Sequence, residues 1–202
     1  MKENYHKKML EIISENQKKQ IIPTLLLHTC CAPCSTTVIA RLSSHFNITV
    51  FYYNPNIEPY EEYLKRKSEQ IRFLEEFESV NPINFLDCDW DNDSFLEMAV
   101  GLEDEPEGGK RCHKCYYHRL LKTAEIAKEQ NFDYFTTSLT ISPYKNSQVI
   151  NKIGEQLQKQ YGASYLFSDF KKENGYLESI MNSKKYELYR QDYCGCHYSQ
   201  NN

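Results

Sequence analysis

The sequence predicts a single α/β domain built on a parallel sheet flanked by helices. Short apolar segments alternate with longer charged segments along the whole chain, which is the pattern of strands joined by crossover helices. A chain of 202 residues with 40% hydrophobic and 26% charged residues is long enough for one ordinary hydrophobic core. No internal repeat, low-complexity segment or linker interrupts the sequence, so we expect one main domain.

Strands are expected where short runs are apolar or β-branched, at residues 24–30, 47–53, 83–88, 132–139 and 165–170. The first run contains Leu25, Leu26 and Leu27 in succession. A continuous apolar run of this length is typical of a parallel strand that is buried on both faces. The run 24–30 therefore predicts a strand in the interior of the sheet.

Helices are expected between these strands, from near Ser35, over 58–78, 94–100, 112–130 and 147–161, and from about Tyr176. The apolar stripe expected for the helix 58–78 consists of Tyr60, Leu64, Ile71, Leu74 and Phe77. Residues 101–111 predict a loop rich in Glu, Gly and Pro. Residues 1–20 predict an appended amphipathic helix, which leaves 21–202 as the main domain.

The composition argues against a membrane or exported protein. No stretch approaches the roughly 20 apolar residues of a membrane helix. The first 20 residues are charged throughout and lack the apolar centre of a signal peptide. We therefore expect a cytoplasmic protein without membrane contact. Disulfides are uncommon in the reducing cytosol, so the eight cysteines predict metal ligands or redox centres.

The charge balance gives no overall attraction for nucleic acid, because the formal net charge is −4. Three local basic runs exist, and they are Lys65-Arg66-Lys67, Lys110-Arg111 with Lys114 and Arg119, and Lys184-Lys185 with Arg190. Such runs are commonly solvated faces. They permit nucleic-acid binding without establishing it.

Cys30, Cys31 and Cys34 place three thiols at a predicted strand-to-helix turn. The N-terminus of a helix carries partial positive charge and free N–H groups, which favour the thiolate form that binds soft metals. Ligands of parallel α/β folds bind at the carboxyl ends of the strands. This cysteine group therefore lies where a functional site is expected.

Cys112 and Cys115 form a Cys-x-x-Cys pair at the start of a predicted helix. Such a pair binds a metal centre or forms a redox dithiol. Together with Cys30 and Cys31 it completes a four-thiolate set, which both zinc and iron–sulfur clusters use. The combination differs from the repeated Cys-x-x-Cys pairs of zinc ribbons, and this favours an iron–sulfur cluster.

Cys194 and Cys196 flank Gly195 near the C-terminus. Two cysteines this close can form only a small strained disulfide, for which Gly195 supplies backbone freedom. Strained disulfides are easily reduced and tend to be catalytic, whereas the alternative is a tail with two idle thiols. Cys88 ends an apolar strand, and we interpret it as a core residue.

Other candidates stay open at this level. His28 precedes the first cysteines and either tunes the site or is a hydrogen-bonded strand histidine. Asp87 and Asp89 flank Cys88 at the end of the third strand, and either could face the site as acid, base or hard ligand. The polar segment 142–146 either binds a phosphate or ribose, or caps the helix that follows it.

Several motifs occur in one order along the chain after residue 23, and they are His28-x-Cys30-Cys31-Ala32-Pro33-Cys34, residues 51–57, Arg111-Cys112-x-x-Cys115-Tyr116, residues 137–146 and Tyr193-Cys194-Gly195-Cys196. Together they resemble the non-cobalamin epoxyqueuosine reductases of the QueH type. The resemblance implies a nucleotide-hydrolase-like fold of the HUP type, in which cysteines replace the phosphate loop after the first strand. It also makes 21–202 the epoxyqueuosine reductase domain and leaves 1–20 outside the match.

The resemblance implies reduction of epoxyqueuosine to queuosine at the wobble position of the tRNAs for Asp, Asn, His and Tyr, the last step of queuosine synthesis. It implies that a [4Fe-4S] cluster is bound by Cys30, Cys31, Cys112 and Cys115. It further implies that Cys194 and Cys196 form a redox-active disulfide. An additional iron is compatible with it, and whether Cys34 or an Asp would bind this second metal stays open.

The partners that the resemblance implies are the tRNA anticodon arm carrying epoxyqueuosine and an unidentified electron donor. The basic runs and the tyrosines would bind the anticodon arm, which must present its base unstacked. One alternative is a zinc-stabilised RNA-binding module without redox activity, which shares the four thiolate ligands. Another is a metal-free thiol–disulfide oxidoreductase that works through Cys112 and Cys115 and leaves the first cysteine group unexplained.

Overall fold

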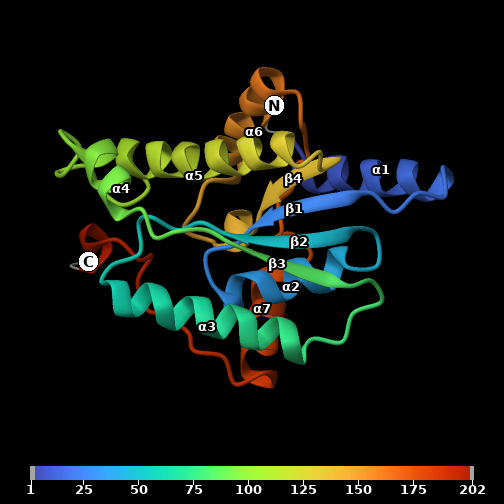
Figure 1. The fold of residues 1–202 in the computed structure, drawn as a ribbon, viewed down its shortest axis with the longest axis horizontal. Coiled ribbons are helices and arrows are strands. Elements are labelled where there is room, and N and C mark those ends of the chain that lie inside the picture. The colour runs from blue at the N-terminus through green and yellow to red at the C-terminus, as the bar shows by residue number, and fades with distance from the viewer. Residues whose placement is uncertain (1–2, 201–202) are drawn as a thin grey trace.

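The computed structural model describes residues 3–200 and contains one parallel sheet between helices (Figure 1). Its strands are β1 (Thr24–His28), β2 (Asn47–Tyr52), β3 (Ile83–Asp87), β4 (Tyr134–Thr137) and β5 (Ser164–Tyr165). Its α-helices are α1 (Tyr5–Lys18), α2 (Ala32–Leu42), α3 (Tyr60–Glu76), α4 (Asn92–Ala99), α5 (Lys110–Glu129), α6 (Ser147–Tyr161) and α7 (Gly175–Lys185). There are also two 3-10 helices in the described residues. The first, η1 (Ser138–Ile141), follows β4, and the second, η2 (His197–Ser199), lies near the C-terminus.

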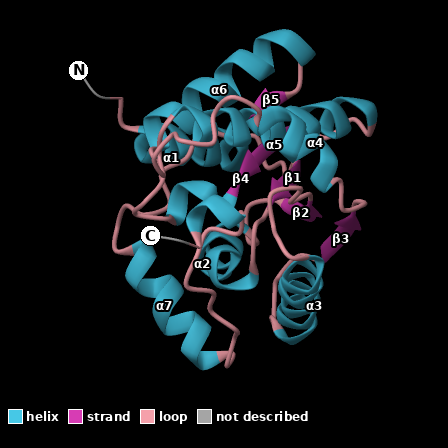
Figure 2. Cartoon of the chain, turned by 90° about the vertical axis from the view of Figure 1, so that its left-hand side faces the viewer, coloured by secondary structure: helices cyan, strands magenta, loops and turns pink. Residues whose placement is uncertain are grey.

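The strand order is β3-β2-β1-β4-β5, and all neighbouring strands are parallel. Helices α2, α3 and α7 cover one face of this sheet, and α4, α5 and α6 cover the other (Figure 2). The predicted fold class, a single α/β domain with a parallel sheet flanked by helices, is therefore confirmed. Because β1 lies in the middle, both of its edges are paired.

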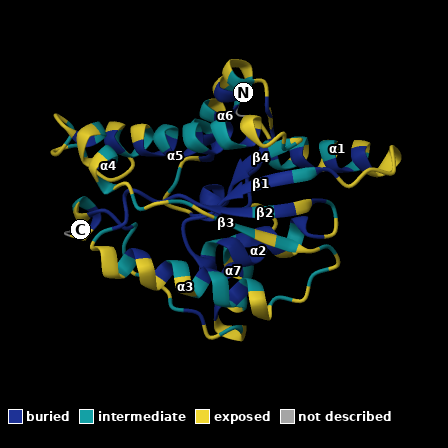
Figure 3. Cartoon of the chain, in the orientation of Figure 1, coloured by how far each residue is buried: buried dark blue, intermediate teal, exposed yellow. Residues whose placement is uncertain are grey.

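The two largest core clusters lie on opposite faces of the sheet, and β1 contributes to both. Leu25 and Leu27 belong to the cluster that contains α2, whereas Leu26 belongs to the cluster that contains α5. All three leucines are fully buried, and Figure 3 shows β1 as a buried strand. Successive strand side chains point to opposite faces, so a continuous apolar run is what a central parallel strand requires.

Helix α1 packs on the main domain instead of extending away from it. Met9 and Ile13 are buried in the core cluster, and Tyr5 stacks on Phe167 with ring centroids 5.7 Å apart. Asn4 caps the helix by accepting a hydrogen bond from the Lys7 backbone N–H. The predicted helix 1–20 is thus found at Tyr5–Lys18, while the division into 1–20 and 21–202 stays a prediction.

The prediction of a long fifth strand over 165–170 is wrong, because β5 ends at Tyr165. The side chain of Asn151, on α6, forms hydrogen bonds with both the N–H and the carbonyl of Ser168. These backbone groups are therefore satisfied by a helix side chain, and no neighbouring strand is needed. The fourth strand is likewise shorter than 132–139, since η1 begins at Ser138 and Thr137 Oγ1 accepts from the Leu139 N–H.

The second helix begins at Ala32, three residues before the predicted start. Pro33 lies in its first turn, where a proline costs no hydrogen bond and its fixed φ suits the helix. Cys34 is therefore part of the helix. Cys31 is the N-cap residue, with an extended backbone.

The expected apolar stripe of α3 is wrong at Tyr60 and Leu64, whereas Leu74 and Phe77 pack against the core. The buried residues of α3 are Tyr63, Arg66, Gln70 and Phe73, whereas Tyr60 and Leu64 are 45% and 43% exposed. The helix therefore buries a neighbouring face that carries an arginine and a glutamine. Within residues 3–200, no helix is long and apolar enough to cross a membrane.

Candidate redox site

The candidate site lies at the carboxyl ends of β1 and β4, which pair side by side up to His28 and Thr137. From β1 the chain continues to α2 and then to β2 on one side, while β4 leads toward β5 on the other side. This reversal of strand order is the point at which open α/β sheets bind ligands. The first cysteine group follows β1 at this point.

Cys30, Cys31 and Cys34 gather their thiols at the start of α2. Cys31 is fully buried, Cys30 is 8% exposed and Cys34 is half-buried. The Sγ atoms of Cys30 and Cys31 are 3.7 Å apart, and all three Sγ atoms lie within 4.8 Å of one another. The three thiols are therefore close enough to bind one metal centre.

The charges around this group favour a thiolate at Cys30. Hydrogen bonds from the Cys31 and Cys34 thiols lower the pKa of Cys30 well below its ordinary value, and Arg119 and Lys145 add to this effect. Because Cys31 donates to Cys30, the pKa of Cys31 rises to about 12. Cys34 shifts in the same direction as Cys31 for the same reason: its pKa rises well above the ordinary value. One thiolate is thus stabilised by two thiols and two cations.

Arg119, on α5, lies between the cysteine groups and is 1% exposed. Its Nη2 donates to Asn54 Oδ1 at 2.7 Å. Burial alone would lower the pKa of Arg119, but the thiols of Cys115, Cys30 and Cys194 raise it above its ordinary value. Arg119 is therefore a buried cation that faces thiols from three parts of the sequence.

Cys112 and Cys115 do not belong to the close group around Cys30 in the described part of the chain. They line a small apolar cavity together with Cys194 and Cys196. The Gly108 N–H donates to Cys112 Sγ at 3.2 Å. The structure thus brings the Cys-x-x-Cys pair together with the C-terminal cysteines, and their ligand roles stay predictions.

A second cavity of about 340 Å³ adjoins the first one, and Cys194 lines both. This volume is at the lower end of the range of small-molecule sites. Cys30 and Cys34 also line it, so thiols from both cysteine groups face the same space. The remaining lining is mostly polar and aromatic and includes Arg119, Ser142, Tyr144, Lys145, Arg190 and Tyr193.

The C-terminal segment 186–197 reaches this cavity along α3. Arg66 Nη1 donates to the Cys194 carbonyl at 3.0 Å, and the Glu58 N–H donates to the Gly195 carbonyl at 2.8 Å. Gln191 Nε2 donates to Cys31 Sγ at 2.8 Å, which joins the segment to the first cysteine group. Cys194 and Cys196 are free thiols, so their predicted disulfide is absent from this structure.

His28 is a hydrogen-bonded strand histidine, the second of the two interpretations that the sequence left open. Its Nε2 lies 3.0 Å from the Tyr53 carbonyl and its Nδ1 lies 2.8 Å from Thr137 Oγ1. Arg119 Nε also donates to Nε2 at 3.3 Å, so Nε2 either donates to the Tyr53 carbonyl or accepts from Arg119, depending on the tautomer. Burial, with the charge of Arg119, lowers the pKa of His28 to about 3, which keeps the ring neutral.

Several other expectations are resolved by the contacts of the side chains. Asp87 forms an ion pair with Lys67 on α3 and does not line either cavity. Asn146 caps α6 by accepting from the Gln148 N–H at 3.0 Å, which favours the capping interpretation of 142–146. Cys88 is half-buried and packs against the core, as predicted.

The lysines of the basic runs are mostly exposed, as is Arg190, but three arginines of these runs are buried. Arg66, Arg111 and Arg119 are at most 3% exposed. Arg111 donates to the carbonyls of Leu102 and Glu103, which fixes the loop before α5. These three arginines therefore do not lie on a solvated face, while the binding of RNA by the basic runs stays a prediction.

The fold and the site define a parallel α/β oxidoreductase with a thiol-lined centre at the switch point of the sheet. The chain belongs to the epoxyqueuosine reductase family QueH, whose family model matches residues 25–202. A relative from Streptococcus pyogenes, epoxyqueuosine reductase QueH, is 45% identical over 97% of this chain and 78% of its own length. Because this match covers 97% of the chain, it also includes most of α1.

More distant relatives carry the same name. Epoxyqueuosine reductase QueH of Staphylococcus epidermidis is 41% identical over 96% of this chain and 83% of its own length. The protein of that name from Thermotoga maritima is 34% identical over 87% of this chain and 90% of its own length. The family that the motifs predicted is therefore confirmed.

Proposed function

We propose that this protein reduces epoxyqueuosine to queuosine at the wobble position of tRNAs for Asp, Asn, His and Tyr, the final step of queuosine synthesis. The observation that carries the proposal is the cavity of about 340 Å³ lined by Cys30, Cys34 and Cys194. Its volume suits a modified nucleobase, and thiols of both cysteine groups face it. Family membership supplies the substrate class.

A [4Fe-4S] cluster bound by Cys30, Cys31, Cys112 and Cys115 is the cofactor of this proposal. The chemistry of the residues fits such a group. A cluster with thiolate ligands is anionic, and the buried cation of Arg119 and the half-buried cation of Lys145 would balance its charge. The N–H donors of Gly108 and Gln191 already point at Cys112 and Cys31, and such hydrogen bonds tune iron–sulfur centres.

The reaction converts an epoxide to an alkene and needs two electrons and two protons, with the oxygen released as water. When bound, the cluster supplies electrons at low potential. Oxidation of the Cys194 and Cys196 dithiol to a disulfide releases two electrons and two protons, which balances the reaction. An electron donor that remains to be identified would then reduce this disulfide for the next turnover.

Lys145 is the residue that would stabilise the departing oxygen. It lines the cavity, and although burial would lower its pKa, the thiols of Cys194 and Cys30 raise it well above the ordinary value. The ammonium therefore keeps its proton and acts as a fixed positive charge. Electrostatic stabilisation, and not proton donation, is its proposed role.

Metal analysis of anaerobically purified protein tests the proposal. We expect about four irons with matching sulfide per chain and a brown colour that dithionite bleaches. Iron above this content would indicate a second metal, with Cys34 or an Asp as its ligand. The purified protein should also convert epoxyqueuosine in tRNA to queuosine under reducing conditions, as measured by nucleoside mass spectrometry.

A second candidate is a zinc-stabilised RNA-binding module without redox activity. It is favoured by the 3.7 Å separation of the Cys30 and Cys31 sulfurs. Ligands at about 2.3 Å around a tetrahedral zinc ion are about 3.8 Å apart. Stoichiometric zinc and no colour after anaerobic reconstitution with iron and sulfide would replace the reductase proposal with this one.

A further inference from the structure

Tyr144 stands on the short loop between η1 and α6 and lines the cavity of about 340 Å³. Its side chain is 77% exposed, the largest exposure of any aromatic residue among the large hydrophobic side chains of residues 3–200. Its ring takes no part in the aromatic and cation–π contacts of the described residues. A large ring is therefore displayed at the mouth of the cavity without a protein partner.

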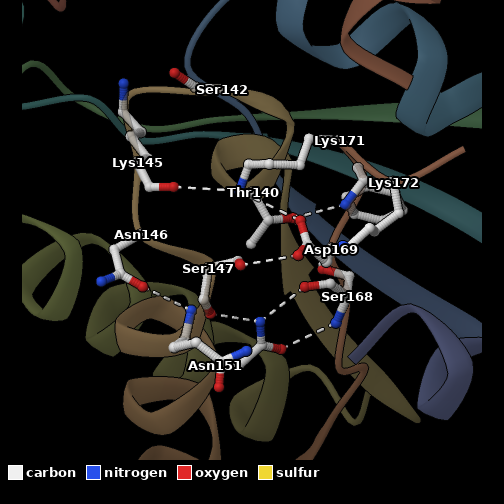
Figure 4. A network of polar contacts seen from close by, with 12 residues as sticks. Thr140, Ser142, Lys145, Asn146, Ser147, Asn151, Ser168, Asp169, Lys171 and Lys172 are labelled. Carbon is white, nitrogen blue, oxygen red and sulfur yellow. Dashed lines mark hydrogen bonds and ion pairs between the residues drawn. The ribbon is translucent and has the colours of Figure 1, made fainter. Parts of the chain in front are cut away.

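Hydrogen bonds on both sides of Tyr144, at Ser142 and Lys145, fix the backbone of the loop that carries it. Ser142 Oγ accepts from the Tyr144 N–H at 3.3 Å, and the Ser142 carbonyl accepts from the Lys145 N–H at 3.3 Å. Lys171 Nζ donates to the Lys145 carbonyl at 3.2 Å, within the polar network of Figure 4. Asn146 fixes the start of α6, as described above. The backbone is therefore preorganised while the ring is free, which limits the entropy lost on binding.

Arg190, in the segment before Cys194, lines the same cavity and is exposed. Its Nη1 donates to Ser183 Oγ at 3.2 Å, which anchors the side chain to α7. Guanidinium groups have five N–H donors, so this contact leaves donors for a ligand. An exposed guanidinium that is anchored by one hydrogen bond and keeps free N–H donors is suited to binding a phosphate.

We propose that Tyr144 and Arg190 form a subsite for single-stranded RNA at the mouth of the cavity. Tyr144 stacks on a base of the unpaired anticodon loop, and Arg190 binds a backbone phosphate beside it. Aromatic stacking on unpaired bases and arginine contacts to phosphates are the two usual components of such recognition. The inference rests on the proposed function and names residues that dock its substrate.

Binding of a labelled RNA tests the subsite. The probe is the fluorescein-labelled anticodon stem-loop of an Asp tRNA with guanosine at the wobble position, titrated with holoprotein and followed by anisotropy. Tyr144→Ala should weaken binding about five- to 150-fold, the range of one stacked base. Tyr144→Phe should bind as the wild type does, because the ring face is kept. Tyr161→Ala, at the far end of α6, is the control and should change nothing.

The salt dependence separates the two residues. Arg190→Gln should weaken binding and reduce the slope of log Kd against log salt by about 0.7, the value for one phosphate contact of single-stranded nucleic acid. Tyr144→Ala should leave this slope unchanged, since stacking releases no counterion. A Tyr144→Ala variant with unchanged cluster absorbance shows that the fold is intact.

The outcomes distinguish this proposal from the proposed function. If the wild type binds the stem-loop and Tyr144→Ala binds equally well, the stacking subsite is wrong while the RNA substrate stands. If the wild type and all variants fail to bind, the RNA partner is wrong and the subsite falls with it. Equal losses in Tyr144→Ala and Tyr161→Ala would also overturn the subsite.

Discussion

The guanidinium of Arg66 lies against the backbone of Cys194, 128 residues away in the sequence, and donates to its carbonyl from Nη1 at 3.0 Å. Arg66 Nε pairs with Glu62 at 2.6 Å, and the guanidinium lies over the ring of Tyr193. Arg66 is 1% exposed. A buried ion pair on α3 therefore fixes the position of the C-terminal cysteine pair.

Other polar residues at helical spacing continue this contact along α3. Glu69 accepts from the Tyr189 N–H at 2.8 Å, and Arg72 donates to the carbonyls of Tyr186 and Glu187. Glu62 also accepts from the Tyr189 hydroxyl. The segment 186–197 is thus attached to α3 mainly through polar contacts, which explains why α3 buries a face containing Arg66.

Replacing Arg66 by Gln should destabilise the protein by about 3–5 kcal/mol, because Glu62 then keeps an unpaired charge in a nearly buried position. Urea unfolding of the metal-free protein measures the change. Arg72→Gln is the comparison on the same helix: it loses partly exposed ion pairs and two hydrogen bonds to the carbonyls of Tyr186 and Glu187, so its cost should be smaller than that of Arg66→Gln. Equal effects of the two substitutions would contradict the role assigned to Arg66.

Replacing Gly195 by Ala should disturb the Cys194 and Cys196 pair. Gly195 has φ +137°, and an added Cβ would lie 3.0 Å from Ile57 Cγ1. The control is Gly162→Ala, where φ is +76° but nothing lies within 4 Å, so only the backbone strain is introduced. We expect Gly195→Ala to lose about 1–3 kcal/mol more than the control, as crowding does in packed sites. Equal melting temperatures of Gly195→Ala and Gly162→Ala in thermal unfolding would refute this prediction.

Replacing Cys194 by Ser should leave the proposed cluster in place and impair repeated turnover. Cys194 lines both cavities, so its thiol is placed to pass electrons between the second cysteine pair and the substrate. The visible spectrum reports the cluster, and steady-state conversion of tRNA reports turnover. Cys88→Ser, outside both cavities, is the control. An unchanged steady-state rate in Cys194→Ser would exclude the dithiol from the reaction.

His118 should make the stability of the protein depend on pH. Burial lowers the pKa of His118 below its ordinary value of 6.5, with Arg119 adding to the shift and Asp91 and Glu125 opposing it. Its Nε2 lies 3.0 Å from both the Tyr53 hydroxyl and Ser94 Oγ. The unfolded chain takes up a proton near pH 6.5 and the folded protein does not, so this stabilisation is complete above that pH and is lost as the pH falls.

The His118→Gln variant tests this dependence. It should reduce the loss of unfolding free energy between about pH 7.5 and pH 5.5, the range in which a free histidine titrates. An NMR titration that places the pKa of His118 at or above 6.5 would contradict the prediction.

The sequence by itself determined the alternation of strands and helices and the position of Cys30 to Cys34 after the first strand. These features are local: Leu25, Leu26 and Leu27 form a continuous apolar run that predicts a buried strand, and β1 contains this run. The motifs around the cysteines also determined the family. Spacing alone placed Cys112 and Cys115 together at a helix start.

Only the tertiary structure decided which polar side chains are buried. Arg66 and Arg119 belong to basic runs that look solvated, yet they meet the Cys194 carbonyl and Asn54 in the interior. For the same reason, the apolar pattern of α3 did not indicate that Arg66 and Gln70 are buried. Burying a charge is favourable only when a partner is present, and these partners come from segments 65 and 128 residues away. Such long-range pairs leave no periodic signal in the sequence.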